Sequence, residues 1–154
     1  MAVHTLLATQ TIHADLDEAW RFFSDPRNLA RITPKELGFE IRTKDLPAAI
    51  YEGLMITYTV RPLLGIPVTW LSEITHVEER SSFIDEQRVG PYRVWHHEHR
   101  FRELGPSQVE VTDRVTYVLP FGPLGSLLHG VLVKPQLNKI FAYRDKIITE
   151  IFGR

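Results

Sequence analysis

The sequence predicts an α+β fold in which a seven-stranded antiparallel sheet wraps around a long C-terminal helix and encloses a cavity. β-Branched residues begin the chain, six strand-like runs with short connections follow, and an apolar stripe at helical spacing ends it. Short connections imply antiparallel neighbours. We expect the cavity between sheet and helix, with a volume on the order of several hundred Å³, as is usual for ligand sites.

The first segment, residues 3–13, is rich in β-branched residues and predicts a strand. Asp15, followed three residues later by Glu18, is typical of a helix start and predicts a short helix over residues 16–23. Pro26 then begins a second short helical turn. The chain therefore starts with one strand and two small helices.

Six further strands are predicted, most of them separated by turns that contain Gly or Pro. They cover residues 37–43, 53–61, 66–77, 82–89, 93–103 and 109–119. From Leu124 to Ile151 apolar residues recur at helical spacing and predict the long terminal helix. Pro135 cannot donate a backbone hydrogen bond, so we expect it to kink or divide this helix.

Composition narrows the function. The 154 residues fit one domain spanning 1–154. A net charge of -1 with scattered basic residues argues against nucleic acid as a partner. Without cysteine there is no disulfide, thiolate nucleophile or cysteine zinc site. The sequence shows neither a signal peptide nor an apolar stretch of about 18 residues, so we expect a cytoplasmic protein without membrane insertion.

Particular motifs carry a family resemblance. Residues 83–92 read FIDEQRVGPY, residues 95–101 read WHHEHRF, residues 113–115 read DRV, and residues 120–123 read PFGP. Together with the element order they resemble the START-like, or SRPBCC, superfamily of helix-grip folds, and a bacterial ligand-binding subgroup that includes proteins labelled polyketide cyclase or cell-division inhibitor. The resemblance spans nearly the whole chain. It implies a deep cavity for lipids, sterols, quinones, polyketides or aromatic compounds, without implying one activity.

The inner face of the predicted sheet carries a row of polar side chains. Alternation along residues 93–103 places His97 and His99 on one face, and the same rule places Asp85 and Asp113 on the inner face of neighbouring strands. Both acids then fall near His97, and a register shift of two residues would exchange which histidine meets which acid. The predicted ligand-binding residues are Trp70, Ser72, Phe83, Asp85, Gln87, Trp95, His97, His99, Phe101, Val111, Asp113, Tyr117, Phe141 and Ile148.

Four interpretations of this polar row stay open. The row fixes strand register, or it orients the polar group of a ligand. Alternatively, His97 and Asp113 form a catalytic acid–base pair. In the fourth interpretation His97, His99 and an aspartate hold a metal. Because no further metal signature accompanies the two histidines, we expect no metal and no cofactor.

The predicted function is binding, for transport or sequestration, of a hydrophobic small molecule such as a lipid, isoprenoid, quinone or aromatic polyketide. The alternative is a polyketide cyclase or dehydratase that uses His97 and Asp113. A third class is a protein-interaction or regulatory module. The loops at residues 62–67 and 121–125 are apolar, which indicates a cavity mouth or a contact with a transient protein partner.

Overall fold

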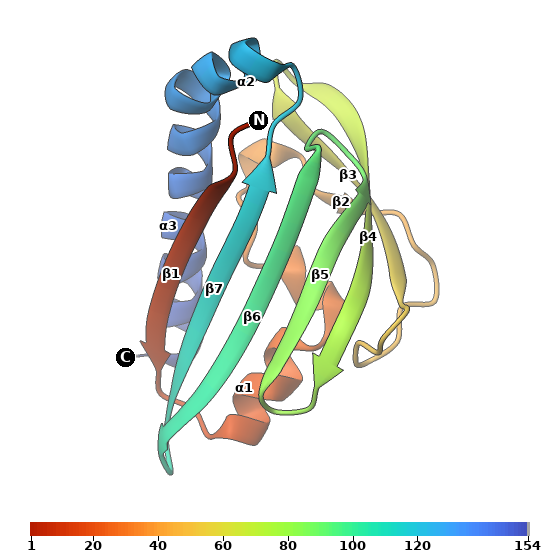
Figure 1. The fold of residues 1–154 in the computed structure, drawn as a ribbon. Coiled ribbons are helices and arrows are strands. Elements are labelled where there is room, and N and C mark those ends of the chain that lie inside the picture. Colours follow the sequence, from red (N-terminus) through yellow and green to blue (C-terminus); the bar gives the residue numbers. More distant parts are fainter. Residues whose placement is uncertain (154) are drawn as a thin grey trace.

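The computed structural model describes residues 1–153. Its strands are β1 (His4–Ile12), β2 (Glu40–Ile41), β3 (Met55–Leu63), β4 (Ile66–Glu78), β5 (Ser82–Val89), β6 (Val94–Gly105) and β7 (Gln108–Val118). They form one antiparallel sheet in the order β1-β7-β6-β5-β4-β3-β2. The sheet curves past the long helix α3 (Lys134–Phe152), as Figure 1 shows. The predicted seven-stranded α+β architecture is therefore confirmed.

Helix α1 (Leu16–Phe23) begins and ends as its sequence predicts. The Asp15 carboxylate accepts a hydrogen bond from the backbone N–H of Glu18 (2.8 Å), which satisfies one of the free donors of the first turn. The helix buries Trp20 and Phe23 against the sheet at the end away from α2 in Figure 1. A 3₁₀ helix, η1 (Pro26–Leu29), follows directly.

The strand predicted over residues 37–43 is mostly absent from the sheet, because only β2 pairs with β3 there. A second 3₁₀ helix, η2 (Lys35–Leu37), occupies the start of this segment. Gly38 follows with a left-handed φ of 56°, and a Cβ at this position would lie 2.8 Å from Cδ of Arg61. The chain therefore turns at a glycine that packs closely against β3, and the remaining residues form only a short edge strand.

The C-terminal helical segment has three parts. Helix α2 (Gly122–Leu128) leads into a π-helical turn, η3 (His129–Val133), and then into the 19-residue helix α3. Pro135 lies just after this π-helical turn, and its missing N–H leaves one backbone hydrogen bond of the helical run unmade there. The predicted effect of Pro135 appears only as the π-helical turn just before it, because the helical residues run without a break from 122 to 152. No helix within residues 1–153 is both long and apolar enough to cross a membrane.

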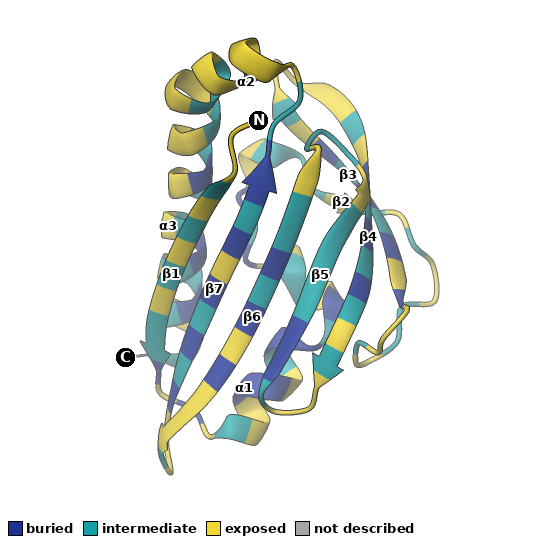
Figure 2. Cartoon of the chain, viewed as in Figure 1, coloured by how far each residue is buried: buried dark blue, intermediate teal, exposed yellow. Residues whose placement is uncertain are grey.

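Both apolar loops predicted from the sequence are exposed. Leu64 in the β3–β4 turn is 87% exposed, and Phe121 before α2 is 70% exposed. The Gln136 side chain donates to the carbonyl of Pro62 (2.7 Å), which ties the β3–β4 hairpin to the start of α3. The hairpin therefore sits beside α3, and Figure 2 shows exposed residues over α2 at the same end of the molecule.

Buried residues alternate with exposed ones along the central strands (Figure 2), as expected for a sheet with one covered face. The largest buried cluster lies under α1 and contains Ile12, Ala14, Ala19, Trp20, Phe23, Ile32, Phe83, Phe101, Val109, Val111 and Ile148. A second cluster covers β3 and β4, and a third joins β7 to α3. The Gln10 amide donates to the carbonyl of Asp145 and to the hydroxyl of Thr149 (2.9 Å each), which fastens α3 to β1.

Ile148 tests whether α3 is fastened through this core. Its side chain is 2% exposed, so Ile148→Ala removes buried methyl groups and leaves a cavity. We expect a loss of about 2–5 kcal/mol in the free energy of unfolding, measured by urea denaturation. Ile151→Ala on the same helix is the matched control because Ile151 is 36% exposed, and it should cost far less. Equal losses from both variants would contradict the packing described here.

Candidate functional site

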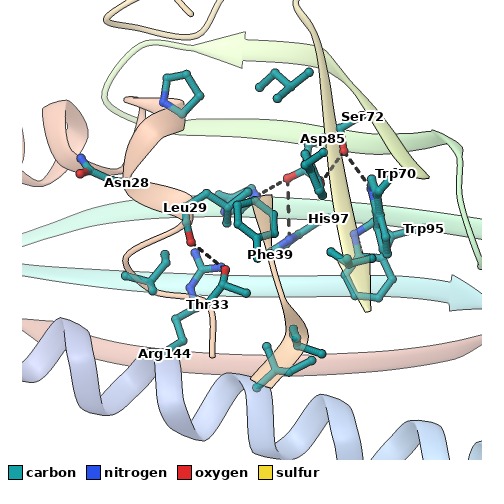
Figure 3. Close-up of a pocket in the computed structure, with 18 of the residues that line it drawn as sticks. Asn28, Leu29, Thr33, Phe39, Trp70, Ser72, Asp85, Trp95, His97 and Arg144 are labelled. Carbon is teal, nitrogen blue, oxygen red and sulfur yellow. Dashed lines mark hydrogen bonds and ion pairs between the residues drawn. The ribbon is translucent and has the colours of Figure 1, made fainter. Parts of the chain in front are cut away.

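A cavity of about 200 Å³ lies between the concave face of the sheet and α3. Figure 3 shows Trp70 and Trp95 on one side of it and Asn28 and Thr33, from the η1–η2 segment, on the other. The volume is below the several hundred Å³ expected from the sequence, because aromatic side chains fill part of the space. The rings of Trp70 and Trp95 lie 5.3 Å apart, and those of Tyr92 and Trp95 lie 4.7 Å apart, measured between centroids.

Strands β5, β6 and β7 bring the predicted polar row together. Asp85 lies directly opposite His97, and His99 lies directly opposite Asp113. Both histidines and Asp113 are buried, while the Asp85 side chain keeps 17% of its exposure. All four side chains point inward because each stands at an inward position of the alternating strands.

Each histidine of the row contacts both aspartates. His97 Nε2 is 2.8 Å from Asp113 Oδ1, and His99 Nε2 is 2.6 Å from Asp85 Oδ2. Two longer contacts cross between them, His97 Nδ1 to Asp85 Oδ2 at 3.7 Å and His99 Nδ1 to Asp113 Oδ1 at 3.3 Å. The two imidazole rings stack with centroids 3.7 Å apart. The two pairings that the sequence left open therefore coexist.

Arg144 of α3 completes the group, and the sequence analysis did not identify it. Its Nη2 lies 3.3 Å from Asp113 Oδ1, and the residue is 7% exposed. Figure 3 shows the side chain reaching from α3 toward the strands. Helical spacing was the available signal, because Arg144 follows Leu137 and Phe141 and precedes Ile148 on one helix face. Asp85, His97, His99, Asp113 and Arg144 are called the polar cluster below.

The pKa shifts follow from burial and from these contacts. Burial raises the pKa of Asp113, but the Arg144 charge and the two histidines outweigh it and hold that pKa well below its usual range. Burial also raises the pKa of Asp85, and His97 and His99 again lower it on balance. Both carboxyl groups are therefore ionised at neutral pH.

The two histidines shift in opposite directions. Burial and the neighbouring His99 lower the pKa of His97, which is therefore neutral. Burial lowers the pKa of His99 too, but its contacts with Asp113 and Asp85 raise it on balance, which favours the charged form of this ring. In the state with a protonated His99, two carboxylates, one imidazolium and the Arg144 guanidinium sum to no net charge, which stabilises the polar cluster in an apolar surrounding.

The neutral His97 has a defined tautomer. Its Nε2 faces the Asp113 carboxylate, which can only accept, so the proton is assigned to Nε2. His97 Nδ1 then carries a lone pair, and it has no hydrogen-bond partner within residues 1–153. This nitrogen can accept a hydrogen bond, take up a proton or bind a cation.

A second polar group lies on β3 and β4. The Trp70 indole N–H donates to the hydroxyl of Ser72 (3.0 Å), and the hydroxyls of Tyr58 and Ser72 lie 2.9 Å apart. Burial raises the pKa of Tyr58, so its phenol stays protonated. Ser72 is occupied by these two partners, and its main effect is to orient the two aromatic rings.

The structure places some of the predicted ligand-binding residues on the cavity wall and the others away from it. Those on the cavity wall are Trp70, Ser72, Phe83, Asp85, Trp95, His97, His99 and Phe141. Asp113 does not line the cavity but contacts both histidines from behind. Contact of any of these residues with a ligand stays a prediction.

Three predicted wall residues belong instead to the core under α1. Phe101, Val111 and Ile148 are buried there among apolar side chains. They do not line the cavity, because α1 covers this end of the sheet and its Trp20 ring packs on Phe101, with centroids 5.4 Å apart. Alternation gives the face of a strand that a residue occupies, but not whether another element fills the space above it.

Gln87 and Tyr117 are also placed away from the cavity. The Gln87 amide donates to the carbonyl of Tyr92 (2.6 Å) and accepts from its N–H (3.0 Å), and Gly90 leaves room for it. Gln87 therefore braces the β5–β6 turn and positions Tyr92 on the cavity wall. The Tyr117 hydroxyl pairs with His129 Nε2 (2.7 Å), which joins β7 to η3.

Removal of Arg144 tests the ion pair within the polar cluster. Arg144→Met leaves Asp113 buried without its strongest counter-charge, and we expect a loss of about 3 kcal/mol or more in unfolding free energy by urea denaturation. The control is Arg102→Met, because Arg102 of β6 pairs with Glu110 of β7 on the exposed face of the sheet. That variant should change stability by about 1 kcal/mol or less. A loss in Arg144→Met no larger than the control would contradict the charge balance described above.

Comparison with known proteins gives matches in family and in fold. A family model described as polyketide cyclase / dehydrase and lipid transport matches residues 12–142. A search of curated proteins finds no match. The START superfamily protein from Mycobacterium smegmatis superposes with a TM-score of 0.70 at 12% identity, with 96% of this chain and 99% of that chain covered.

Two named enzymes share the fold at low identity. The Zhui aromatase/cyclase from Streptomyces sp. R1128 has a TM-score of 0.68 at 16% identity, with 97% of this chain and 96% of that chain covered. Norcoclaurine synthase from Thalictrum flavum has a TM-score of 0.69 at 13% identity, with 97% and 86% covered. Because the family match extends over most of the sequence, the chain belongs to the polyketide cyclase / dehydrase and lipid transport family.

Proposed function

We propose that the protein binds a compact, mostly apolar small molecule in its cavity, and that the polar cluster orients the molecule's polar group. The observation that carries this proposal is an apolar pocket with a buried group of ionisable side chains on one wall. Ligand sites generally combine apolar walls with a few placed polar groups. Membership of a family that covers cyclases and lipid transport supports the same function.

Cavity size and wall chemistry narrow the ligand class. About 200 Å³ is enough for a compact ring system, whereas a long acyl chain would require side chains to move. The rings of Trp70, Tyr92 and Trp95 favour flat, aromatic or quinone-like molecules, because their faces and edges pack well against other rings. Among the predicted ligands, aromatic polyketides and quinone rings therefore fit best.

Filling the cavity tests the binding proposal. Ile140 lies on the cavity wall, so in Ile140→Trp the larger ring takes up ligand space. Native mass spectrometry of wild-type protein purified gently from its own cells should show a bound apolar molecule that Ile140→Trp lacks. Lys139→Trp, on the exposed side of the same helix, is the control and should keep it. The proposal would be refuted if the wild-type protein carries no small molecule after purification from cells and also binds none after incubation with aromatic polyketides and quinones.

A cyclase or dehydratase activity is the second candidate, and the tautomer of His97 favours it. The Nε2–H group of His97 donates to the Asp113 carboxylate, so Nδ1 of His97 is the basic atom. His97 also lies on the cavity wall. A neutral imidazole held in place by a carboxylate is the usual arrangement of a general base. Such a base would remove a proton next to a carbonyl of a bound polyketide-like molecule.

His97→Gln separates the carrier from the enzyme, since glutamine keeps hydrogen bonding but cannot take up a proton at neutral pH. For a carrier we expect affinity for the co-purifying molecule to stay within about tenfold of wild type. For an enzyme we expect turnover to fall by about 10²-fold or more with binding retained. Affinity is measured by calorimetry and turnover by chromatography of the reaction mixture. Turnover that survives His97→Gln would exclude His97 as the base.

A further inference from the structure

The two histidines of the polar cluster are held by one carboxylate and directed at another. Asp113 accepts from Nε2 of His97 at 2.8 Å and lies 3.3 Å from Nδ1 of His99. The opposite nitrogen of each ring faces Asp85, with distances to its Oδ2 of 3.7 Å from His97 Nδ1 and 2.6 Å from His99 Nε2. Asp113 therefore fixes both rings so that one nitrogen of each converges on Asp85.

Two histidine nitrogens that face one carboxylate oxygen form an arrangement that is common in metal centres. Asp85, His97 and His99 each offer a ligand atom, and these atoms all lie within 4.8 Å of one another. Metal-bound histidines nearly always donate their second ring N–H to a carboxylate or carbonyl, which is the part that Asp113 takes for His97. A single histidine–aspartate pair would be enough for charge balance alone. The two stacked histidines between two aspartates add more: His97, His99 and Asp85 offer ligand atoms, and Asp113 supports the two rings from outside.

The scaffold and the charges also suit a cation. Asp85 on β5 lies directly opposite His97 on β6, and His99 follows two residues along β6, so small backbone shifts do not separate the three side chains. Arg144 contacts Asp113 at 3.3 Å and neutralises the outer carboxylate, which leaves the charge of Asp85 for the metal. A bound cation would take the place of the proton that His99 and Asp85 share in the metal-free cluster.

We propose that Asp85, His97 and His99 form a binding site for a divalent first-row transition metal on the cavity wall. Two imidazoles and one carboxylate suit Zn²⁺, Co²⁺ or Fe²⁺, whereas Mg²⁺ and Ca²⁺ prefer oxygen ligands alone. All three residues line the cavity, so the remaining coordination positions face the space for a ligand. The proposed site departs from the sequence prediction, which expected no metal, and it does not depend on the organic ligand proposed above.

Titration of the metal-free protein with Co²⁺ alone tests this site. We expect one ion per chain, detected by calorimetry and by visible absorption of the bound ion. Asp85→Asn, His97→Gln and His99→Gln should each weaken binding by more than the roughly 10- to 100-fold expected for Asp113→Asn, which removes only the outer partner. Absence of binding to the wild-type protein would overturn the proposal.

Surface histidines provide the controls. His96 Nδ1 pairs with Glu86 Oε1 at 3.0 Å on the outer face of the same strands, and the rings of His4 and His129 stack with centroids 3.5 Å apart. His96→Gln and His129→Gln should leave Co²⁺ binding unchanged. Loss of binding in either control, with binding retained in His97→Gln and His99→Gln, would place the ion on the surface and overturn the proposal.

A measurement on the wild-type protein covers the case in which a cluster variant fails to fold. Crystals soaked in Zn²⁺ should give an anomalous diffraction peak about 2.0–2.2 Å from a nitrogen of each histidine and from an Asp85 oxygen. A peak elsewhere, or none, would refute the site. This failure would leave the comparison of Ile140→Trp with Lys139→Trp untouched, so the metal site and the organic ligand are tested separately.

Discussion

The buried carboxylate of Asp113 is the constraint on which the rest of the site depends. Its β7 position places it beneath both histidines of β6, and its contact with Arg144 connects the sheet to α3. An ionised carboxylate in an apolar interior is tolerated only with close counter-charges and hydrogen bonds. Asp113 obtains these from β6, which carries both histidines, and from α3, so strand register and helix position are set by the same group that orients the imidazoles.

Period-two alternation is the reason that the inner face was predictable. His97 and His99 stand two residues apart on one strand, and Asp85 and Asp113 occupy inward positions on the strands at either side. A shift of one residue would have moved the whole row to solvent, so burial of the apolar members fixes the polar ones as well. The strand limits also followed from turn chemistry, with Ser82–Val89 matching its predicted limits.

What the sequence analysis missed depends on contacts between elements far apart in the chain. Arg144 lies on the inward face of α3, but helical spacing does not tell that an arginine there meets a carboxylate of β7. Phe101 and Ile148 occupy inward positions, yet α1 fills the space beside them. The Gln87 amide makes its hydrogen bonds with the backbone of Tyr92, within the β5–β6 turn. In each case the face of the element was predictable and the partner was not.

In the proposed function, ligand selection rests on the polar cluster more than on the apolar walls. Aromatic and aliphatic walls attract any apolar molecule of suitable size, because hydrophobic burial scales with area and carries little directional information. Nε of Arg144 is buried without a hydrogen-bond partner in the described chain, and His97 Nδ1, on the cavity wall, makes no hydrogen bond within residues 1–153. A ligand with no polar group leaves both unsatisfied, at a cost of about 1–3 kcal/mol for each buried group. A molecule whose oxygen reaches the cluster avoids that cost, so the cluster separates compounds that the apolar walls would bind alike.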